Sequence, residues 1–141
     1  SSEEKVMMLR EFGKNLGVIF QITDDILDYS SSENVLGKAI GGDFFEGKIT
    51  LPIILIYAKA DAEDKKLIAD LFTENFSSGE KNQNHFTIIS SLLAKYAGLE
   101  MARNMALLQH QTAMENLKIF PDSAAKQGLI TILDHSLSRI S

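Results

Sequence analysis

Apolar residues near the start of the chain recur at steps of three and four. They are Val6, Leu9, Phe12, Leu16, Ile19, Phe20, Ile26 and Leu27. This period predicts a long amphipathic helix from Glu3 to about Tyr29, with Ser2 as its N-cap and acidic residues in its first turn. From Leu16 onwards the segment is apolar nearly all round, so we expect that half of the helix to be deeply buried.

The rest of the chain predicts further helices separated by polar segments. Residues 30–48 are rich in Ser and Gly and have no sustained period, which indicates a long loop of the kind that is often functional. We expect a helix that opens at Leu51-Pro52, a second one capped by Asp61, and a third over about 86–96 that stops at Gly98. A polar connector over 77–84 separates the last two of these.

Two more helices complete the prediction. One covers 99–118, and the other follows the start signal at 121–123. The residues expected on their inner faces are Ala102, Met105, Ala106, Gln109, Ala113 and Leu117 in the first, and Leu129, Ile132, Leu133, Leu137 and Ile140 in the second. The predicted fold is therefore all-α, in one body.

Composition narrows the class of protein. The 141 residues are 45% hydrophobic with only two prolines, which excludes a disordered or collagen-like chain. No cysteine is present, so there is neither a disulfide framework nor a thiolate metal site. A net charge of -5 argues against a nucleic-acid partner. No apolar run approaches the roughly 20 residues of a membrane span.

Three carboxylates stand on the most apolar helix. Asp24, Asp25 and Asp28 lie within about 100° of arc, and Gln21 falls in the same arc. Asp is a poor residue for a helix interior, and clustered carboxylates repel one another strongly where the dielectric is low. A solvated acidic face is the simpler alternative, but the apolar flanks favour burial. Carboxylate oxygens in such a place suit a hard divalent cation such as Mg²⁺, completed by substrate phosphates.

The loop that follows the carboxylates carries lysines among glycines. Its members are Lys38, Asp43 and Lys48, with Gly37, Gly41, Gly42 and Gly47. Lysine suits diphosphate oxygens as a point charge, and glycine lets the backbone approach closely. Residues 42–48 spell G-x-x-x-x-G-K, but Ile49 stands where a P-loop needs Ser or Thr, and no predicted strand precedes the segment. A P-loop is therefore excluded.

These motifs together resemble the C-terminal signature of trans-prenyl diphosphate synthases. The residues that carry the resemblance are Gly17-x-x-Phe20-Gln21-x-x-Asp24-Asp25-x-x-Asp28, Leu36-Gly37-Lys38, and Gly42-Asp43-x-x-Glu46-Gly47-Lys48-x-Thr50-Leu51-Pro52. They stand in order over about a quarter of the chain. One departure is Ala39, where many members of the family have Pro.

The resemblance implies a transferase of the isoprenoid synthase type, an all-α helical bundle. An allylic diphosphate ionises with the help of Mg²⁺, its cation alkylates isopentenyl diphosphate, and a proton leaves. By resemblance, Asp24 and Asp28 bind Mg²⁺ or its waters, Asp25 shapes the site, and Asp43 orients a metal-bound water. The resemblance likewise implies catalytic roles for Asp24, Asp28 and Lys38. It implies substrate-binding roles for Lys38 and Lys48 at the allylic diphosphate and for Phe20 and Gln21 in the substrate cavity.

The resemblance also implies that residues 1–141 are the C-terminal portion of a single catalytic domain. The family's first aspartate-rich motif is not found here, so we expect this chain alone to be inactive. A long-chain synthase of the octaprenyl or decaprenyl type, which feeds quinone side chains, is the leading interpretation. A geranylgeranyl or farnesyl type and a non-catalytic helical regulatory subunit stay open. A cytoplasmic homodimer is the expectation for the full-length protein.

Overall fold

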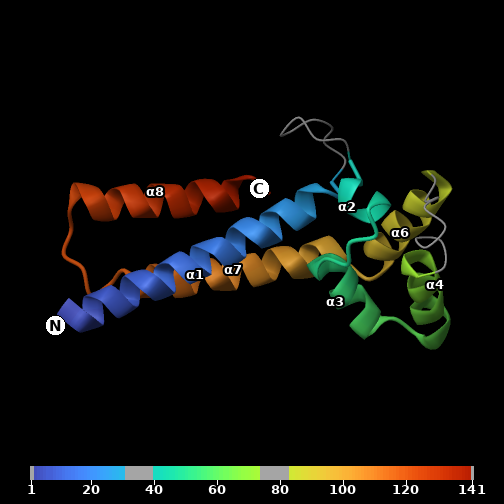
Figure 1. Ribbon diagram of the computed structural model, residues 1–141, viewed down its shortest axis with the longest axis horizontal. Coiled ribbons are helices and arrows are strands. Elements are labelled where there is room, and N and C mark those ends of the chain that lie inside the picture. The colour runs from blue at the N-terminus through green and yellow to red at the C-terminus, as the bar shows by residue number, and fades with distance from the viewer. Residues whose placement is uncertain (1, 31–39, 74–82, 141) are drawn as a thin grey trace. The chain divides into compact units, whose positions relative to one another are not determined.

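The computed structural model describes residues 2–30, 40–73 and 83–140, and every regular element in these ranges is a helix. The all-α prediction is therefore confirmed. The helices are α1 (Ser2–Leu27), α2 (Gly42–Phe45), α3 (Leu51–Lys59), α4 (Ala62–Phe72), α6 (Gln83–Lys95), α7 (Gly98–Asn116) and α8 (Ala124–Ser138) (Figure 1). They form two compact units: Ser1–Asp24 with Arg103–Ser141, and Asp25–Ala102.

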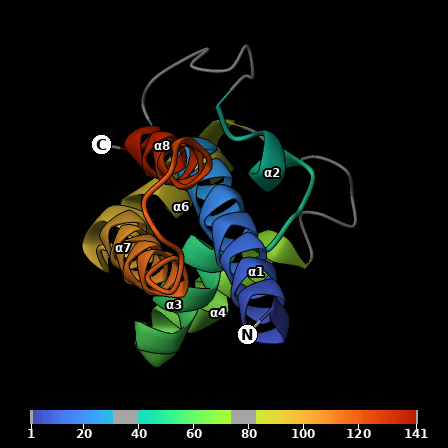
Figure 2. The ribbon, with the colours of Figure 1, turned by 90° about the vertical axis from the view of Figure 1, so that its left-hand side faces the viewer.

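The first unit is built from three helical segments, namely α1 up to Asp24, the later part of α7, and α8. Figure 2 looks along this group and shows α8 beside both of its partners. The buried residues of its core are Phe12, Ile19, Ala113, Leu117 and Leu133. The side chain of Ser123 accepts the backbone N–H of Lys126 at 3.0 Å and caps α8, which confirms the predicted start of this helix.

Small residues on α7 let this packing be close, because Ala106 and Ala113 are completely buried. Two residues expected on inner faces are instead exposed: Met105 at 40% and Ile132 at 52%. These two predictions were wrong, because the neighbours cover only one side of each helix.

Helix α1 is less buried than its composition suggests. Gly17, Val18, Phe20 and Gln21 are exposed, and only from Ile22 onwards are most side chains buried. The expectation of burial from Leu16 is therefore wrong for this first stretch. At the other end, Ser2 is the first residue of the helix itself and not its N-cap, while the acidic first turn is as predicted.

The second unit is organised around aromatic rings. Phe44, on the short helix α2, is fully buried and makes edge-on contacts with Phe45, Phe72 and Phe86 at centroid distances of 5.4–5.9 Å. The larger cluster of buried residues also takes side chains from α3, α4 and α6. The segment predicted as a long loop thus contains a helix, and the burial of Phe44 explains it.

The helices α3 and α4 of this unit begin where the sequence predicted. Pro52 lies in the first turn of α3, and the side chain of Asp61 caps α4 by accepting the N–H of Asp64 at 2.8 Å. The predicted connector over 77–84 falls mainly outside the described residues.

The joint between α6 and α7 differs from the prediction. Helix α6 ends at Lys95, and Ala97 takes the left-handed conformation with φ 55° that usually requires glycine. Gly98 does not stop a helix but opens α7. A Cβ atom there would lie 2.6 Å from both Ile56 Cγ2 and Leu93 Cδ2, so close packing and not backbone conformation requires glycine at this position.

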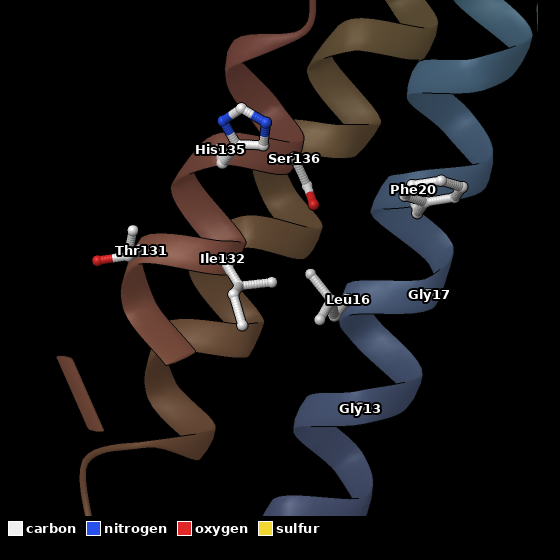
Figure 3. Close-up of a pocket in the computed structure, with 8 residues that line it drawn as sticks. All are labelled: Gly13, Leu16, Gly17, Phe20, Thr131, Ile132, His135 and Ser136. Atoms are coloured by element: carbon white, nitrogen blue, oxygen red, sulfur yellow. The ribbon is translucent and has the colours of Figure 1, made fainter. Parts of the chain in front are cut away.

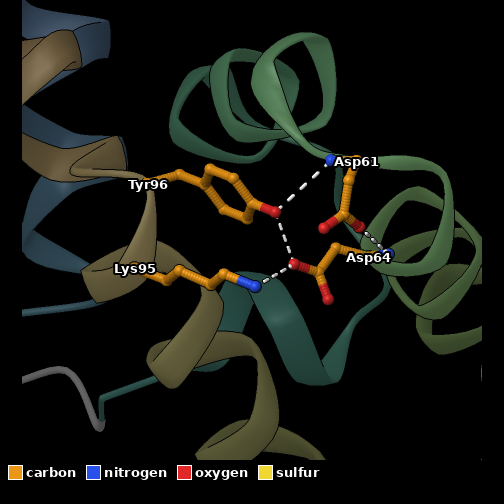
Figure 4. A network of polar contacts seen from close by, with 4 residues as sticks. All are labelled: Asp61, Asp64, Lys95 and Tyr96. Atoms are coloured by element: carbon orange, nitrogen blue, oxygen red, sulfur yellow. Dashed lines mark hydrogen bonds and ion pairs between the residues drawn. The ribbon is translucent and has the colours of Figure 1, made fainter.

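A polar network ties α4 to the end of α6 (Figure 4). Lys95 Nζ lies 2.6 Å from Asp64 Oδ2, and the Tyr96 hydroxyl donates to the same oxygen. The N–H of Asp61 donates to the Tyr96 hydroxyl at 3.3 Å. Lys95 and then Tyr96 lower the pKa of Asp64 by bonding to its ionised form.

None of the helices in the described part of the chain is long and apolar enough to cross a membrane.

Candidate active site

Two of the predicted site residues meet directly in the second unit. Asp28 lies one residue beyond the end of α1, and both of its carboxylate oxygens accept the backbone N–H of Asp43, at 3.0 and 3.1 Å. The N–H of Gly41 donates to the backbone carbonyl of Asp28 at 2.7 Å. The aspartate-rich motif and the glycine-rich segment, 15 residues apart, are therefore joined by buried hydrogen bonds.

Lys48 extends this arrangement. Its backbone N–H donates to the carbonyl of Asp43 at 2.8 Å, and its Nζ lies 3.7 Å from Asp43 Oδ1. The Lys48 side chain is 63% exposed, whereas that of Asp43 is 12% exposed. A largely buried carboxylate on an anchored backbone thus stands beside an exposed ammonium group that can turn towards a ligand.

Glycine conformations shape this turn. Gly41 has φ 85° and Gly47 has φ 77°, both in the left-handed region. A Cβ atom on Gly41 would approach the Phe86 ring to 2.7 Å. Backbone conformation therefore requires glycine at two of the predicted positions, Gly41 and Gly47.

The pKa of the buried Tyr29 hydroxyl is affected by the carboxylates around it. Burial raises its pKa far above the usual range, and the carboxylates of Asp28, Asp43 and Asp25 raise it further, in that order. Its ring stacks on Phe86 at 6.0 Å, and its buried hydroxyl has no hydrogen-bond partner among the described residues. Three predicted metal-site carboxylates therefore act electrostatically on one phenol.

The donor set of this unit fits a hard cation. Counted as whole residues, Asp25, Asp28 and Asp43 are each at most 8% exposed. Their carboxylates are oxygen donors of the type that Mg²⁺ prefers. Among the described residues no group of three or more His, Asp or Glu side chains is already arranged to hold a metal. Mg²⁺ commonly takes only one or two carboxylates, with waters and substrate phosphates as its other ligands. The pair Asp28 and Asp43 is compatible with that mode.

Asp24 belongs to the first unit, where it faces a different partner. Arg139 Nη2, just after α8, lies 3.6 Å from Asp24 Oδ1. The same guanidinium donates to the hydroxyl of Thr23 at 3.2 Å and lies 4.7 Å from the centre of the Phe20 ring. Sequence reasoning did not find Arg139, because a single arginine so far along the chain gives no pattern that points to Asp24.

A cavity of about 680 Å³ lies between α1 and α8 in the first unit (Figure 3). Its lining consists of Gly13, Leu16, Gly17, Phe20, Thr131, Ile132, His135 and Ser136. Phe20, predicted to line a substrate cavity, lies here and is 55% exposed. Gln21 is exposed but is not among the lining residues. Lys38 lies outside the described residues.

The described geometry and the family comparison agree. Residues 1–89 match the family model described as "Polyprenyl synthetase". Because this match covers more than half of the chain, the chain belongs to the polyprenyl synthetase family, and the resemblance to trans-prenyl diphosphate synthases is confirmed.

Several proteins and solved structures are similar to this chain over nearly its whole length. The chain is 33% identical over 138 residues to the octaprenyl diphosphate synthase of Haemophilus influenzae, covering 98% of this chain and 40% of that protein. A crystal structure of a decaprenyl diphosphate synthase from Rhodobacter capsulatus matches with a TM-score of 0.85 at 31% identity, over 99% of this chain and 42% of that one. A geranylgeranyl pyrophosphate synthetase from Pyrococcus horikoshii matches with a TM-score of 0.83 at 32% identity, over 96% and 39%.

One solved relative carries ligands. The polyprenyl synthase from Caulobacter crescentus, described as complexed with calcium and isoprenyl diphosphate, matches with a TM-score of 0.81 at 30% identity, over 96% of this chain and 40% of that one. The chain thus spans about two fifths of the length of these relatives.

Proposed function

We propose that this chain is the C-terminal part of a Mg²⁺-dependent prenyl diphosphate synthase, a prenyltransferase that joins an allylic diphosphate to isopentenyl diphosphate. The observation that carries the proposal is the link between its two motifs, in which the carboxylate of Asp28 accepts the N–H of Asp43. This link and the adjacent Lys48 bring metal-type and diphosphate-type ligands together within one unit. Membership of the polyprenyl synthetase family supports the same conclusion.

Each residue has a physical role in this proposal. Asp24 and Asp28 would bind the metal or its waters, Asp25 would shape the site, and Asp43 would orient a metal-bound water. When bound, Mg²⁺ would neutralise the charge that builds up on the departing diphosphate. Lys48, and by resemblance Lys38, would place ammonium groups on the same diphosphate before it leaves. Because Asp28 fixes the backbone of Asp43, the second carboxylate needs little reorganisation when the substrate binds.

The substrate chain requires an apolar surface. Phe20 offers an aromatic face in the cavity of the first unit, and the resemblance gives Gln21 a neighbouring role. We propose a long-chain product, with a geranylgeranyl-type product as the second candidate because a synthase of that kind is also among the similar structures. A homodimer and a cytoplasmic location stay predictions from the resemblance.

The experiment measures incorporation of radiolabelled isopentenyl diphosphate into extractable polyprenyl product. We expect product from this chain when the N-terminal segment of the Haemophilus influenzae relative precedes it, and none from the 141 residues alone. Asp28→Asn and Asp43→Asn should each lower kcat by about 10²- to 10³-fold. Asp122→Asn is the matched control, because its side chain is 95% exposed on another segment.

Two results would contradict parts of this proposal. Product from this chain alone would show that the 141 residues contain a working active site. Binding of Mg²⁺ and an allylic diphosphate analogue by the extended protein, without any product, would favour the non-catalytic regulatory subunit. Chromatography of the product against prenyl standards separates the two chain-length candidates.

A further inference from the structure

Arg139 makes three contacts with one face of α1, and all three are with residues in or beside the aspartate-rich motif. Its guanidinium pairs with Asp24 at 3.6 Å, donates to Thr23 at 3.2 Å and lies against Phe20 at 4.7 Å. The Arg139 side chain is only 13% exposed. A guanidinium so nearly covered by protein must be stabilised by these contacts, because an unpaired buried charge is costly.

The three contacts differ in strength. Thr23 is completely buried, and its hydroxyl also donates to the carbonyl of Phe20 at 3.0 Å, so this partner is rigid. The contact with Asp24 is longer than a hydrogen bond, and the Asp24 side chain is 28% exposed. The guanidinium is therefore held by Thr23 and Phe20, while its ion pair with Asp24 is loose and open to solvent.

From this geometry we infer that Arg139 is a positioning residue for Asp24. The positive charge of Arg139 orients the Asp24 carboxylate until a divalent cation takes the place of the guanidinium. The inference rests on the proposed function, which assigns Asp24 to the metal. An arginine beside a metal ligand neutralises that ligand in the metal-free protein and repels the incoming cation. Arg139 would thus lower the affinity of this carboxylate for a metal ion alone.

The decisive variant is Arg139→Gln, because glutamine removes the charge and keeps an N–H donor on a shorter side chain. Isothermal titration with Mg²⁺ alone, at low salt, should show binding about three- to tenfold tighter than in the parent chain. Arg139→Lys keeps the charge and should bind Mg²⁺ as the parent does. A merely structural role for Arg139 would weaken or leave unchanged the binding in both variants.

A second measurement leaves Arg139 in place for its main result, and an Arg139 variant serves only as its control. The chain contains no tryptophan, and Phe20→Trp would therefore provide one indole under the guanidinium. Mg²⁺ should change the emission of this indole, because displacement of Arg139 from Asp24 alters the cation–π contact. The change should be absent when Phe20→Trp is combined with Arg139→Gln. Circular dichroism checks that each variant keeps its helix content.

The outcomes separate this inference from the proposed function. Unchanged or weaker Mg²⁺ binding in Arg139→Gln, including no binding in either protein, overturns the role of Arg139. Indole emission from Phe20→Trp that does not respond to Mg²⁺ overturns it as well. The proposed function is judged by product formation in the extended protein with Arg139 intact. Tighter Mg²⁺ binding without any product would keep the inference on Arg139 and remove the prenyl-transfer reaction.

Discussion

Two carboxylates of one sequence motif are stabilised in different ways in the two units. In the second unit, Asp28 is buried and both of its oxygens accept a backbone N–H. In the first unit, Asp24 is half-buried and faces a guanidinium at 3.6 Å. A bond to the backbone persists unless the local fold changes, whereas a loose ion pair can be exchanged for another cation. Membership of one sequence motif therefore does not imply equal roles in binding.

The largest effect on stability should come from Phe44, which anchors the segment that meets Asp28. Phe44→Ala removes a fully buried ring and should lower the free energy of unfolding by about 3–5 kcal/mol. Phe45→Ala is the matched control on the same short helix, since Phe45 is 38% exposed. Urea denaturation compares them; equal losses would show that α2 is not held through Phe44.

A smaller effect should distinguish the two aspartates. Asp28→Ala leaves the buried N–H of Asp43 without its acceptor and should cost about 1–3 kcal/mol. Asp24→Ala breaks a partly exposed ion pair and should cost less than about 1 kcal/mol.

Removal of Asp28 also relieves repulsion from Asp25 and Asp43, so the comparison needs Asp28→Asn, which removes the charge but keeps an acceptor. We expect Asp28→Asn to be more stable than Asp28→Ala, measured by urea denaturation at high salt. The contrast between the units fails if Asp24→Ala is the more damaging change.

Substitution of one glycine by alanine in each unit tests how tightly that unit is packed. Gly98→Ala brings a Cβ atom to 2.6 Å from two side chains in the second unit and should cost about 1–3 kcal/mol. Gly128→Ala, on α8 in the first unit, meets nothing within 4 Å and should stabilise the chain by about 0.5–1 kcal/mol. Thermal melts report both signs, and a stable Gly98→Ala protein would refute the tight joint between α6 and α7.

The smallest effect concerns pH. The pKa of Asp64 is lowered from its usual value of 3.8, chiefly by Lys95. A lowered carboxyl pKa adds stability above the unfolded value, and that stability is lost as pH falls below 3.8 through the folded value. Urea midpoints at about pH 6 and about pH 3 should therefore differ more in the parent than in Asp64→Asn.

Local signals in the sequence predicted the helices well. Pro52, Asp61 and Ser123 mark helix starts because their effects depend on neighbours a few residues away. The predictions that failed depend on distant partners. The exposure of Phe20 and Ile132 follows from which helix covers which face, and α2 exists because Phe44 fits among rings contributed by α4 and α6.

The residues of the candidate site also fall into those that local sequence signals predicted and those that depend on distant partners. Its carboxylates and glycines could be found from spacing, and the structure joins Asp28 to Asp43 and Lys48 as one group. Arg139 could not be found, because its contact with Asp24 depends on the packing of α8 beside α1. The roles of all the predicted site residues at a metal, a diphosphate or a substrate chain stay predictions.

The hydroxyl of Thr23 has one further consequence. A hydroxyl carries a single proton, and that of Thr23 is already given to the carbonyl of Phe20. Only lone pairs remain on the side that faces Arg139, so whatever replaces the guanidinium there has to bring its own hydrogen. A carboxylate could not satisfy Thr23 in this place, and shorter amide side chains would end well before the position of Nη1. The polarity of one buried oxygen thereby limits which residues position 139 can accept.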